Sequence, residues 1–251
     1  MRKAVVSNLK DFILEFGKDL SLKNFYLPPI PEPAMTFYHA MLLPKHLTLL
    51  QAENRLKEYF GNYVLIGVDE AGRGPLAGPV VAAATVLNDN LKLPNLNDSK
   101  KLSEKQRELI FEELPNYCRY YSIGEASAQE IDEIGILNAD FLAMRRALAS
   151  ITSLLDEKQL PYKILVDGNL YIREIDENLQ MPVIKGDGRI ACIAAASIFA
   201  KVHRDRLMVK FGEQFPNYGF EKHKGYGTKV HLAAIKKYGD CEIHRKSFKR
   251  S

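Results

Sequence analysis

Cysteine is scarce in this chain, with three residues among 251. Cys118, Cys192 and Cys241 are far apart, and no CxxC or Cys/His spacing accompanies them. The missing spacing argues against a structural zinc site, and the odd number argues against a disulfide framework. We interpret all three as reduced thiols of a cytoplasmic protein.

Long apolar runs are missing as well. No run approaches the roughly 18 residues of a membrane-spanning helix. The N-terminus lacks the compact apolar stretch and the small-residue cleavage site of a secretory signal. The sequence therefore predicts a soluble intracellular chain that makes no membrane contact.

A large net charge is the third absence. The formal charge at pH 7 is only +4, which does not by itself identify a nucleic-acid-binding protein. The charge is unevenly distributed, because basic residues outnumber acidic ones by about eight from Lys201 to the C-terminus and the middle of the chain is acidic. This pattern favours a phosphate-binding surface beside a carboxylate metal site, with a merely solvated basic tail as the alternative.

What the chain does have is enough apolar sequence for one good core, since 46% of its residues are hydrophobic. Residues 1–60 differ from the rest, with a helical period over 9–20, prolines within 28–33 and a second helical stretch over about 46–60. We expect 1–60 to be a helical extension with a Pro-rich linker near 28–33, and 61–251 to form the main domain. The extension could serve packing or solubility, or it could grip a substrate.

From residue 63 onward the pattern alternates between strands and helices. Ser103, followed by Glu104, Lys105 and Gln106, supplies an N-cap for a helix. The expected strands cover 63–69, 79–87, 120–126, 162–167 and 181–185, and the other expected helices cover 128–154, with an interruption near Gly135, and 190–210. Such alternation predicts an α/β sheet covered by helices.

Three of the expected strands each deliver acidic residues at their C-terminal end. Asp69 and Glu70 end the first strand, Asp167 follows Ile164 to Val166, and Asp187 follows the strand at 181–185. Sites in open α/β sheets are usually built at this edge, so we expect these carboxylates to lie together. Any one of them alone could be an ordinary polar exit from a strand into a turn.

Carboxylates from separate strands, without His or Cys beside them, favour Mg²⁺ or Mn²⁺ over zinc. Two such ions about 3.5–4 Å apart support in-line attack on a phosphodiester. Four carboxylates without a cation repel one another, so bound ions would also stabilise the folded site.

Ordered blocks of the sequence resemble the ribonuclease HII family, the bacterial type 2 ribonucleases H, over about residues 62–251. The blocks are GVDEAGRGPLAGPV at 67–80, NDSKKLS at 97–103, VDGN at 166–169, KGD at 185–187, AAASIFAKVHRD at 194–205, YGFEKHKGYGT at 218–228 and HRKSF at 244–248. The resemblance implies an RNase H-like fold, with a five-stranded mixed sheet flanked by helices, a helical C-terminal part and, here, the helical N-terminal extension. It assigns 61–251 to the catalytic domain.

The resemblance also implies an activity. A ribonuclease HII hydrolyses the RNA strand of RNA–DNA hybrids and nicks duplex DNA 5′ to an embedded ribonucleotide, leaving 5′-phosphate and 3′-hydroxyl ends. Mn²⁺ or Mg²⁺ is the implied cofactor, in a two-metal-ion mechanism, and the implied cellular role is in DNA replication and repair. We expect a cytoplasmic monomer, and no protein partner is evident from the sequence.

By position, Asp69, Glu70, Asp167 and Asp187 match the family's metal-binding and catalytic acids. The turn Gly72, Arg73 and Gly74 resembles the family's ribonucleotide reader, where glycines let the backbone approach the 2′-hydroxyl. The same turn distinguishes the chain from ribonuclease HIII. Tyr226 matches the aromatic that stacks on the sugar beyond the scissile phosphate. Candidates for phosphate contacts are Lys100, Lys101, Lys201, Lys224 and Arg245.

Several alternatives stay open at this point. His223, His231 and His244 could serve hydrogen bonding or phosphate contact, and we assign Asp205, beside Arg204, to a structural ion pair. A hybrid-only nuclease of the same superfold is a second function, which the intact ribonucleotide-reading turn argues against. A non-catalytic hybrid-binding protein is a third, which the presence of all four acids argues against.

Overall fold

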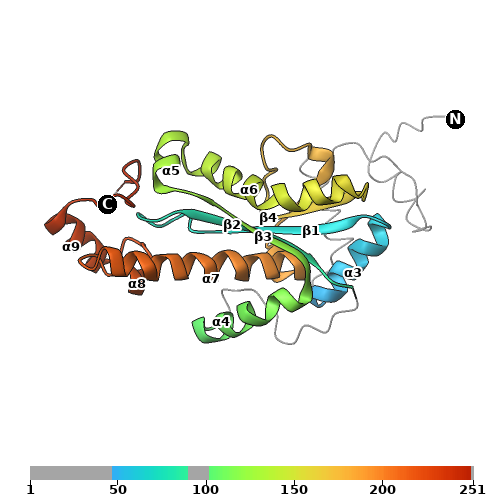
Figure 1. Cartoon of the computed structure of the whole chain (residues 1–251), viewed down its shortest axis with the longest axis horizontal. Coiled ribbons are helices and arrows are strands. Elements are labelled where there is room, and N and C mark those ends of the chain that lie inside the picture. Colours follow the sequence, from blue (N-terminus) through green and yellow to red (C-terminus); the bar gives the residue numbers. More distant parts are fainter. Residues whose placement is uncertain (1–46, 90–101, 250–251) are drawn as a thin grey trace, which may run out of the picture.

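The computed structural model describes residues 47–89 and 102–249 (Figure 1). The segments predicted at 9–20 and 28–33, together with Lys100 and Lys101, lie outside these residues. The strands are β1 (Val64–Ala71), β2 (Val80–Leu87), β3 (Cys118–Ala126), β4 (Tyr162–Asp167) and β5 (Gln180–Val183). The α-helices are α3 (Leu49–Phe60), α4 (Glu104–Glu113), α5 (Ala128–Ile134), α6 (Ile136–Glu157), α7 (Ala191–Gln214), α8 (Phe220–His223) and α9 (Lys229–Tyr238), and the 3₁₀ turns are η2 (Leu114–Tyr117), η3 (Glu177–Leu179) and η4 (Gly186–Gly188).

The strands form one five-stranded sheet in the order β3-β2-β1-β4-β5. β1 pairs antiparallel with β2 and parallel with β4. β2 and β3 are antiparallel, and β4 and β5 are parallel. The α/β class and the five-stranded mixed sheet predicted from the sequence are confirmed.

Helices cover both faces of this sheet (Figure 1). α5 and α6 pack on one face, around Ile66, Val68 and other buried residues. α7 packs on the other face, with α3 and α4 beside it, around Leu65 and its neighbours. Because successive strand residues point to opposite faces, β1 supplies both cores. β2 is buried at every position, as a strand covered on both faces must be.

The long helix α7 approaches the sheet very closely. Its first ten residues are all buried, and Ala, the smallest chiral side chain, occupies five of them. A Cβ placed on Gly67 would lie 2.3 Å from the carbonyl carbon of Cys192. Glycine in β1 and alanine in α7 therefore bring the helix against the strand that carries Asp69.

Helix α3 belongs to the same core as the sheet, although it precedes the predicted boundary at residue 60. Ala52 and Leu56 are buried against α7. Glu53 accepts a hydrogen bond of 2.7 Å from the backbone N–H of Cys192, in the first turn of α7. The division into 1–60 and 61–251 stays a prediction.

Several predicted boundaries differ from the observed ones, those of β1, β5 and α7 among them. β1 continues past Asp69 and Glu70 because its pairing with β2 extends to Ala71. β5 ends at Val183, two residues early, because the chain turns through a left-handed Lys185 with φ of 56°. α7 runs four residues beyond the predicted end, to Gln214.

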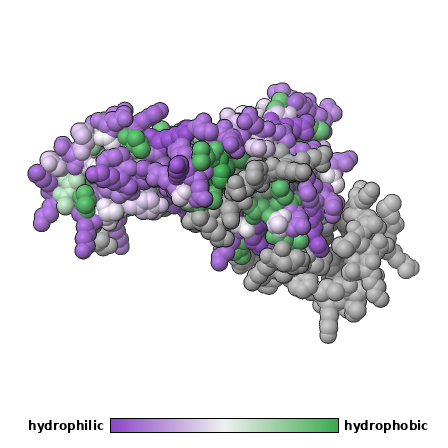
Figure 2. Space-filling model, turned by 90° about the horizontal axis from the view of Figure 1, so that it is seen from below, coloured by the Kyte–Doolittle hydropathy of each residue, from purple (hydrophilic) through white to green (hydrophobic). Residues whose placement is uncertain are grey.

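The C-terminal part is helical, as expected, and forms a third apolar cluster. Tyr218, Phe220 and Ile235 pack there against Leu76 and Ala77, which follow β1. This cluster places α8 and α9 beside the end of β1 that carries the acidic residues. In Figure 2 the face seen from below is mostly hydrophilic, with hydrophobic residues in small separate groups. None of the described helices is apolar over a stretch long enough to cross a membrane.

Candidate active site

Three aspartates predicted from separate strands converge beyond one edge of the sheet. Asp69 lies in β1, Asp167 ends β4, and Asp187 lies in the turn η4. One carboxylate oxygen from each lies within 4.8 Å of the others. The last pair of β1 and β4 in register is Val68 with Val166, so the next residue of each strand is one of these aspartates. Parallel pairing thus brings Asp69 and Asp167 together.

Only Asp167 ends its strand as the sequence predicted. Asp69 lies within β1, and Asp187 comes four residues after β5, delivered by the turn Gly186–Gly188. That turn is tied to β4, because Asp167 Oδ1 accepts hydrogen bonds from the N–H of Gly186 at 2.6 Å and of Asp187 at 3.3 Å. A hydrogen-bonded turn, and not a strand end, therefore positions Asp187.

Glu70 lies beside the three aspartates but outside their group. Glu70 directly follows Asp69 in β1, and its charge acts on Asp69 although it is not one of the three converging carboxylates. Its Oε1 lies 3.4 Å from Arg73 Nη1. Arg73 Nε in turn lies 3.4 Å from Oδ2 of Asp140, a buried acid of α6 that no sequence motif singles out.

Burial and mutual repulsion make these carboxylates unfavourable without a cation. Burial, followed by the charges of Glu70 and Asp167, raises the pKa of Asp69 well above its ordinary value. Burial also raises the pKa of Glu70, and Arg73 partly offsets this. Burial and the charge of Glu70 raise the pKa of Asp140 to about 8, against the lowering effect of Arg73. A divalent cation at the aspartates would relieve this repulsion.

The donor set fits a hard divalent cation. All three converging ligands are carboxylates, and no His or Cys belongs to the group. Oxygen-only ligands suit Mg²⁺ and Mn²⁺. Across residues 47–89 and 102–249, this is the one cluster of three or more acidic, His or Cys side chains arranged to hold a metal.

A pocket adjoins the aspartates and joins several parts of the chain. Its lining comes from β1 and the turn after it, from α4, from α7 and from the segment after α8: Asp69, Glu70, Ala71, Gly72, Arg107, Ser197, Lys201, Arg204 and Tyr226. Arg107, Ser197 and Arg204 were not predicted as site residues. Ser197 hydrogen-bonds to the Asp69 carboxylate. Three sequence blocks of the resemblance, at 67–80, 194–205 and 218–228, thus meet in one place.

Arg245 hydrogen-bonds to the backbone of the turn formed by Gly72, Arg73 and Gly74. Its Nη2 donates to the carbonyl of Gly72 at 2.6 Å, its Nη1 to that of Arg73 at 2.9 Å, and its Nε to that of Gly78 at 2.9 Å. Its side chain is fully buried. Burial, and then the charge of Arg204, lower its pKa to about 9. The guanidinium of Arg245 is therefore used inside the protein, which argues against the predicted phosphate contact.

A second buried arginine, Arg204, also hydrogen-bonds to the backbone of this part of the protein. It donates to the carbonyl oxygens of Ala77, Pro79 and Lys224. Gly72 has φ of 98°, and a Cβ placed there would lie 2.0 Å from Arg204 Nε. Only glycine fits this position, for both conformational and steric reasons. Asp205, expected in an ion pair, forms one with Lys201 at 2.7 Å.

Tyr226 lies next to this turn. It lines the pocket, 48% of it is exposed, and its ring approaches the Cβ position of Gly74 to 3.8 Å. Its N–H donates to the carbonyl of His223. Its own carbonyl lies 2.9 Å from His231 Nδ1. The backbone of Tyr226 is thus fixed on both sides while its ring faces solvent.

The three histidines hydrogen-bond within the protein. His223 accepts from the N–H of Gly225 and contacts the carbonyl of Tyr218. His231 and His244 are both buried, with their Nε2 atoms 3.0 Å apart. Hydrogen bonding, one of the two predicted roles, describes all three.

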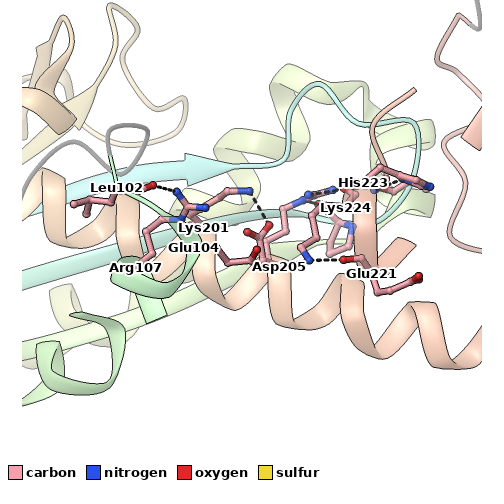
Figure 3. A network of polar contacts seen from close by, with 12 residues as sticks. Leu102, Glu104, Arg107, Lys201, Asp205, Glu221, His223 and Lys224 are labelled. Carbon is pink, nitrogen blue, oxygen red and sulfur yellow. Dashed lines mark hydrogen bonds and ion pairs between the residues drawn. The ribbon is translucent and has the colours of Figure 1, made fainter. Parts of the chain in front are cut away.

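Of the predicted phosphate-binding lysines, Lys201 lines the pocket, and Lys224 belongs to the same network of polar contacts as Lys201 (Figure 3). Lys201 is held by Asp205, and Lys224 lies 2.5 Å from the carbonyl of Glu221 and 3.5 Å from Glu104. Arg107, near them in Figure 3, donates to the carbonyl of Leu102. These contacts fix three cations beside the carboxylates without burying them completely.

The mixed sheet with buried carboxylates at one edge and a basic pocket beside them defines a class, the RNase H-like enzymes that use divalent metal. A comparison with family models narrows this class to one family, because the model described as Ribonuclease HII matches residues 66–251. The chain belongs to this family, whose members are endoribonucleases of the ribonuclease H type.

Individual relatives agree with this assignment. Ribonuclease HII of Fusobacterium nucleatum subsp. nucleatum is 55% identical over 188 residues, which cover 74% of this chain and 86% of that protein. The solved PCNA:RNase HII complex from Archaeoglobus fulgidus contains a similar chain, with a TM-score of 0.57 and 28% identity over 74% of this chain and 95% of that one. Bst-RNase HIII, solved in complex with Mn²⁺, shares the fold at a TM-score of 0.60 and 17% identity, covering 76% of this chain and 68% of that one.

Proposed function

We propose that this ribonuclease H cleaves the RNA strand of RNA–DNA hybrids and also nicks duplex DNA 5′ to a single embedded ribonucleotide, leaving a 5′-phosphate and a 3′-hydroxyl. One observation carries the proposal. A pocket lined by Asp69 also contains Gly72 and Tyr226, so an acidic metal site, a glycine turn and an exposed aromatic ring face the same space.

The metal would be held by Asp69, Asp167 and Asp187, with Glu70 as the fourth ligand. We propose two ions, Mg²⁺ or Mn²⁺, which when bound would lower the pKa of a water and stabilise the leaving oxygen. The chain itself contributes the fixed ligand positions. Asp167 is oriented by two backbone N–H groups, and Asp69 is oriented by Ser197 and by the N–H of Glu70 at 2.8 Å.

Ribonucleotide selection would come from the backbone of Gly72, Arg73 and Gly74. A 2′-hydroxyl is what separates RNA from DNA, and backbone groups can contact it only where side chains leave room. Arg245 holds two carbonyls of this turn, so the turn is already rigid before a substrate binds. Tyr226, fixed at its backbone, would stack on the neighbouring sugar.

Lys201, Lys224 and Arg107 would contact phosphates of the duplex, together with Lys100 and Lys101. Such contacts set the register of a nucleic acid without reading its sequence. The RNA–DNA hybrid and the ribonucleotide-containing duplex are therefore the proposed partners. Removal of ribonucleotides during DNA replication and repair, by a monomer in the cytoplasm, is the proposed cellular role.

The test is cleavage of a labelled DNA duplex carrying one ribonucleotide, beside an all-DNA duplex and a long hybrid, each with EDTA, Mg²⁺ or Mn²⁺. A metal-dependent nick 5′ to the lone ribonucleotide is expected, and no cleavage of the all-DNA duplex. Cleavage of the long hybrid alone would favour a hybrid-only nuclease. Binding without any cleavage would favour a non-catalytic protein.

A matched variant links this activity to the site. Asp69→Asn keeps the shape of the side chain but removes a charged metal ligand. We expect it to lose about a hundredfold or more in turnover while hybrid binding survives, because phosphate contacts supply much of the affinity. Normal cleavage by this variant would contradict the metal assignment.

A further inference from the structure

Asp140 is an acid that neither the fold nor the proposed chemistry requires. It lies in α6, where its neighbours Ala139 and Phe141 are buried in the apolar core. Its side chain is only 2% exposed, and Oδ1 has no hydrogen-bond partner among the described residues. A buried carboxylate with incomplete hydrogen bonding destabilises the fold, so its presence beside a candidate active site suggests a functional reason.

Among the described residues, the cation beside Asp140 is Arg73, the middle residue of the glycine turn. Arg73 Nε lies 3.4 Å from Asp140, and Arg73 Nη1 lies 3.4 Å from Glu70. Its carbonyl oxygen is held by Arg245. The backbone of Arg73 is therefore fixed from one side, and its side chain lies between two carboxylates on the other.

Glu70 has two competing uses in this arrangement. As the proposed fourth metal ligand it would direct its carboxylate to the cations, and its contact with Arg73 would then weaken. If Glu70 were its only partner, the half-exposed Arg73 side chain would then gain many rotamers, and the turn would lose a support. Asp140 offers a second anchor that belongs to a rigid helix and is not part of the metal group.

We propose that Asp140 is a positioning residue that retains the Arg73 side chain when Glu70 turns to the metal, and so keeps the turn Gly72, Arg73 and Gly74 in place to select a ribonucleotide. This inference rests on the proposed function. It assigns to one position of α6 a role in substrate selection that the metal ligands do not supply.

The experiment compares Asp140→Ala, Arg73→Ala and the double variant, with Asp156→Asn, an exposed acid of the same helix, as the control. The first readout is the ratio of kcat/KM for a duplex with one ribonucleotide to kcat/KM for a long hybrid. We expect Asp140→Ala to lower this ratio about threefold to tenfold, mainly by raising KM for the duplex with one ribonucleotide. In the Arg73→Ala background, the same substitution should lower the ratio by less than about twofold. Asp140→Asn, which keeps an oxygen able to accept from Arg73, should retain more of the preference.

The second readout is Mn²⁺ binding measured by calorimetry without substrate. Without Asp140, Arg73 would stay on Glu70 and compete with the ion, so binding should weaken about threefold, and this effect should vanish in the Arg73→Ala background. An effect of Asp140→Ala that persists undiminished without Arg73 would show a general charge effect and overturn the proposal. A ratio equal to that of the Asp156→Asn control would overturn it too.

The two proposals fail separately. If the wild-type chain does not nick the lone ribonucleotide, the proposed function fails, and the Mn²⁺ cycle still decides whether Asp140 acts through Arg73. If the wild-type chain nicks normally and Asp140→Ala does as well, only the role of Asp140 fails. Thermal unfolding of each variant shows that a changed ratio comes from folded protein, and Asp140→Asn replaces Asp140→Ala should the latter not fold.

Discussion

His231 Nε2 lies 3.0 Å from His244 Nε2 in the buried core beneath Tyr226. Between two imidazole nitrogens only one can carry the proton, and the outer contacts decide which. His244 Nδ1 accepts from the N–H of Cys241 at 2.9 Å, so Nε2 of His244 carries its proton and donates to His231. His231 then donates through Nδ1 to the carbonyl of Tyr226. The pair forms a directional chain that ends on the backbone of the exposed aromatic residue.

Removing these hydrogen bonds should loosen the backbone of Tyr226. His244→Phe fills similar space but has no donor for His231, so the tautomer that holds the Tyr226 carbonyl is no longer enforced. We expect KM for a hybrid to rise up to about tenfold, because small misplacements of positioning groups are costly, with Mn²⁺ binding unchanged. Steady-state kinetics and calorimetry measure the two quantities. His203→Phe is the control, because His203 lies in α7 and contacts Glu125 near the surface. Equal effects of the two variants would refute this role.

Arg245 should matter for stability more than its position in a basic C-terminal segment suggests. Arg245→Gln removes donors to the carbonyls of Gly72 and Arg73 and leaves buried acceptors unpaired. The expected loss is about 3 kcal/mol in the free energy of unfolding, measured by urea denaturation.

Arg206→Gln is the matched control for that measurement. Arg206 contacts Glu108 and Glu112 at the surface, with 43% of its side chain exposed, so its loss should cost under about 1 kcal/mol. Should Arg245→Gln cost no more than this control, the turn would not depend on Arg245.

Much of this arrangement follows from sequence patterns, and the exceptions have physical causes. Alternating strand and helix periods predicted the sheet, and acids at the ends of three expected strands predicted the meeting of Asp69 and Asp167. Parallel pairing alone is enough to bring these two together, so local patterns sufficed. Asp187 was predicted on a strand end, but a turn held by hydrogen bonds to Asp167 delivers it, and such long-range bonds leave no local signal.

Two arginines show what the sequence patterns do not predict. Arg245 and Arg204 resemble surface cations in sequence, yet both are buried because backbone carbonyls from the segment after β1 surround them. Asp140 occupies an ordinary position in an amphipathic helix, and only the structure shows Arg73 beside it. Burial of a charged residue depends on partners distant in sequence, which periodicity cannot reveal.

Glu53 provides a pH-dependent test of the link between α3 and α7. Burial raises the pKa of Glu53 above its ordinary value of 4.5, against the lowering effect of Lys57. A raised pKa means that the folded state favours the neutral acid, so this group's contribution to stability is fully present below about pH 4.5 and is lost as pH rises through the folded-state pKa. Glu53→Gln removes the ionisation, and the stability of the wild-type chain relative to this variant should therefore fall as pH rises.

Chemical unfolding at several pH values between about 4 and 8 measures that difference. Glu53→Ala separates ionisation from hydrogen bonding, because it leaves the N–H of Cys192 without its acceptor, and we expect it to be about 2 kcal/mol less stable than Glu53→Gln at all these pH values. A pH-independent difference between wild type and Glu53→Gln would mean that burial of the charge is not felt in the folded state.

The aspartate cluster should destabilise the chain when no metal is present. Burial together with the charges of Glu70 and Asp167 raises the pKa of Asp69, so Asp69→Asn removes an unfavourable charge. In EDTA we expect this variant to unfold at the same temperature as the wild type or a higher one, with a gain of up to about 1 kcal/mol. Added Mn²⁺ should then raise the Tm of the wild type, because a ligand that binds only the folded state stabilises it, and should raise that of Asp69→Asn much less. Asp156→Asn, distant from the cluster on α6, should follow the wild type in both conditions. A variant that loses stability in EDTA and keeps the full Mn²⁺ shift would mean that Asp69 serves the fold and not the metal.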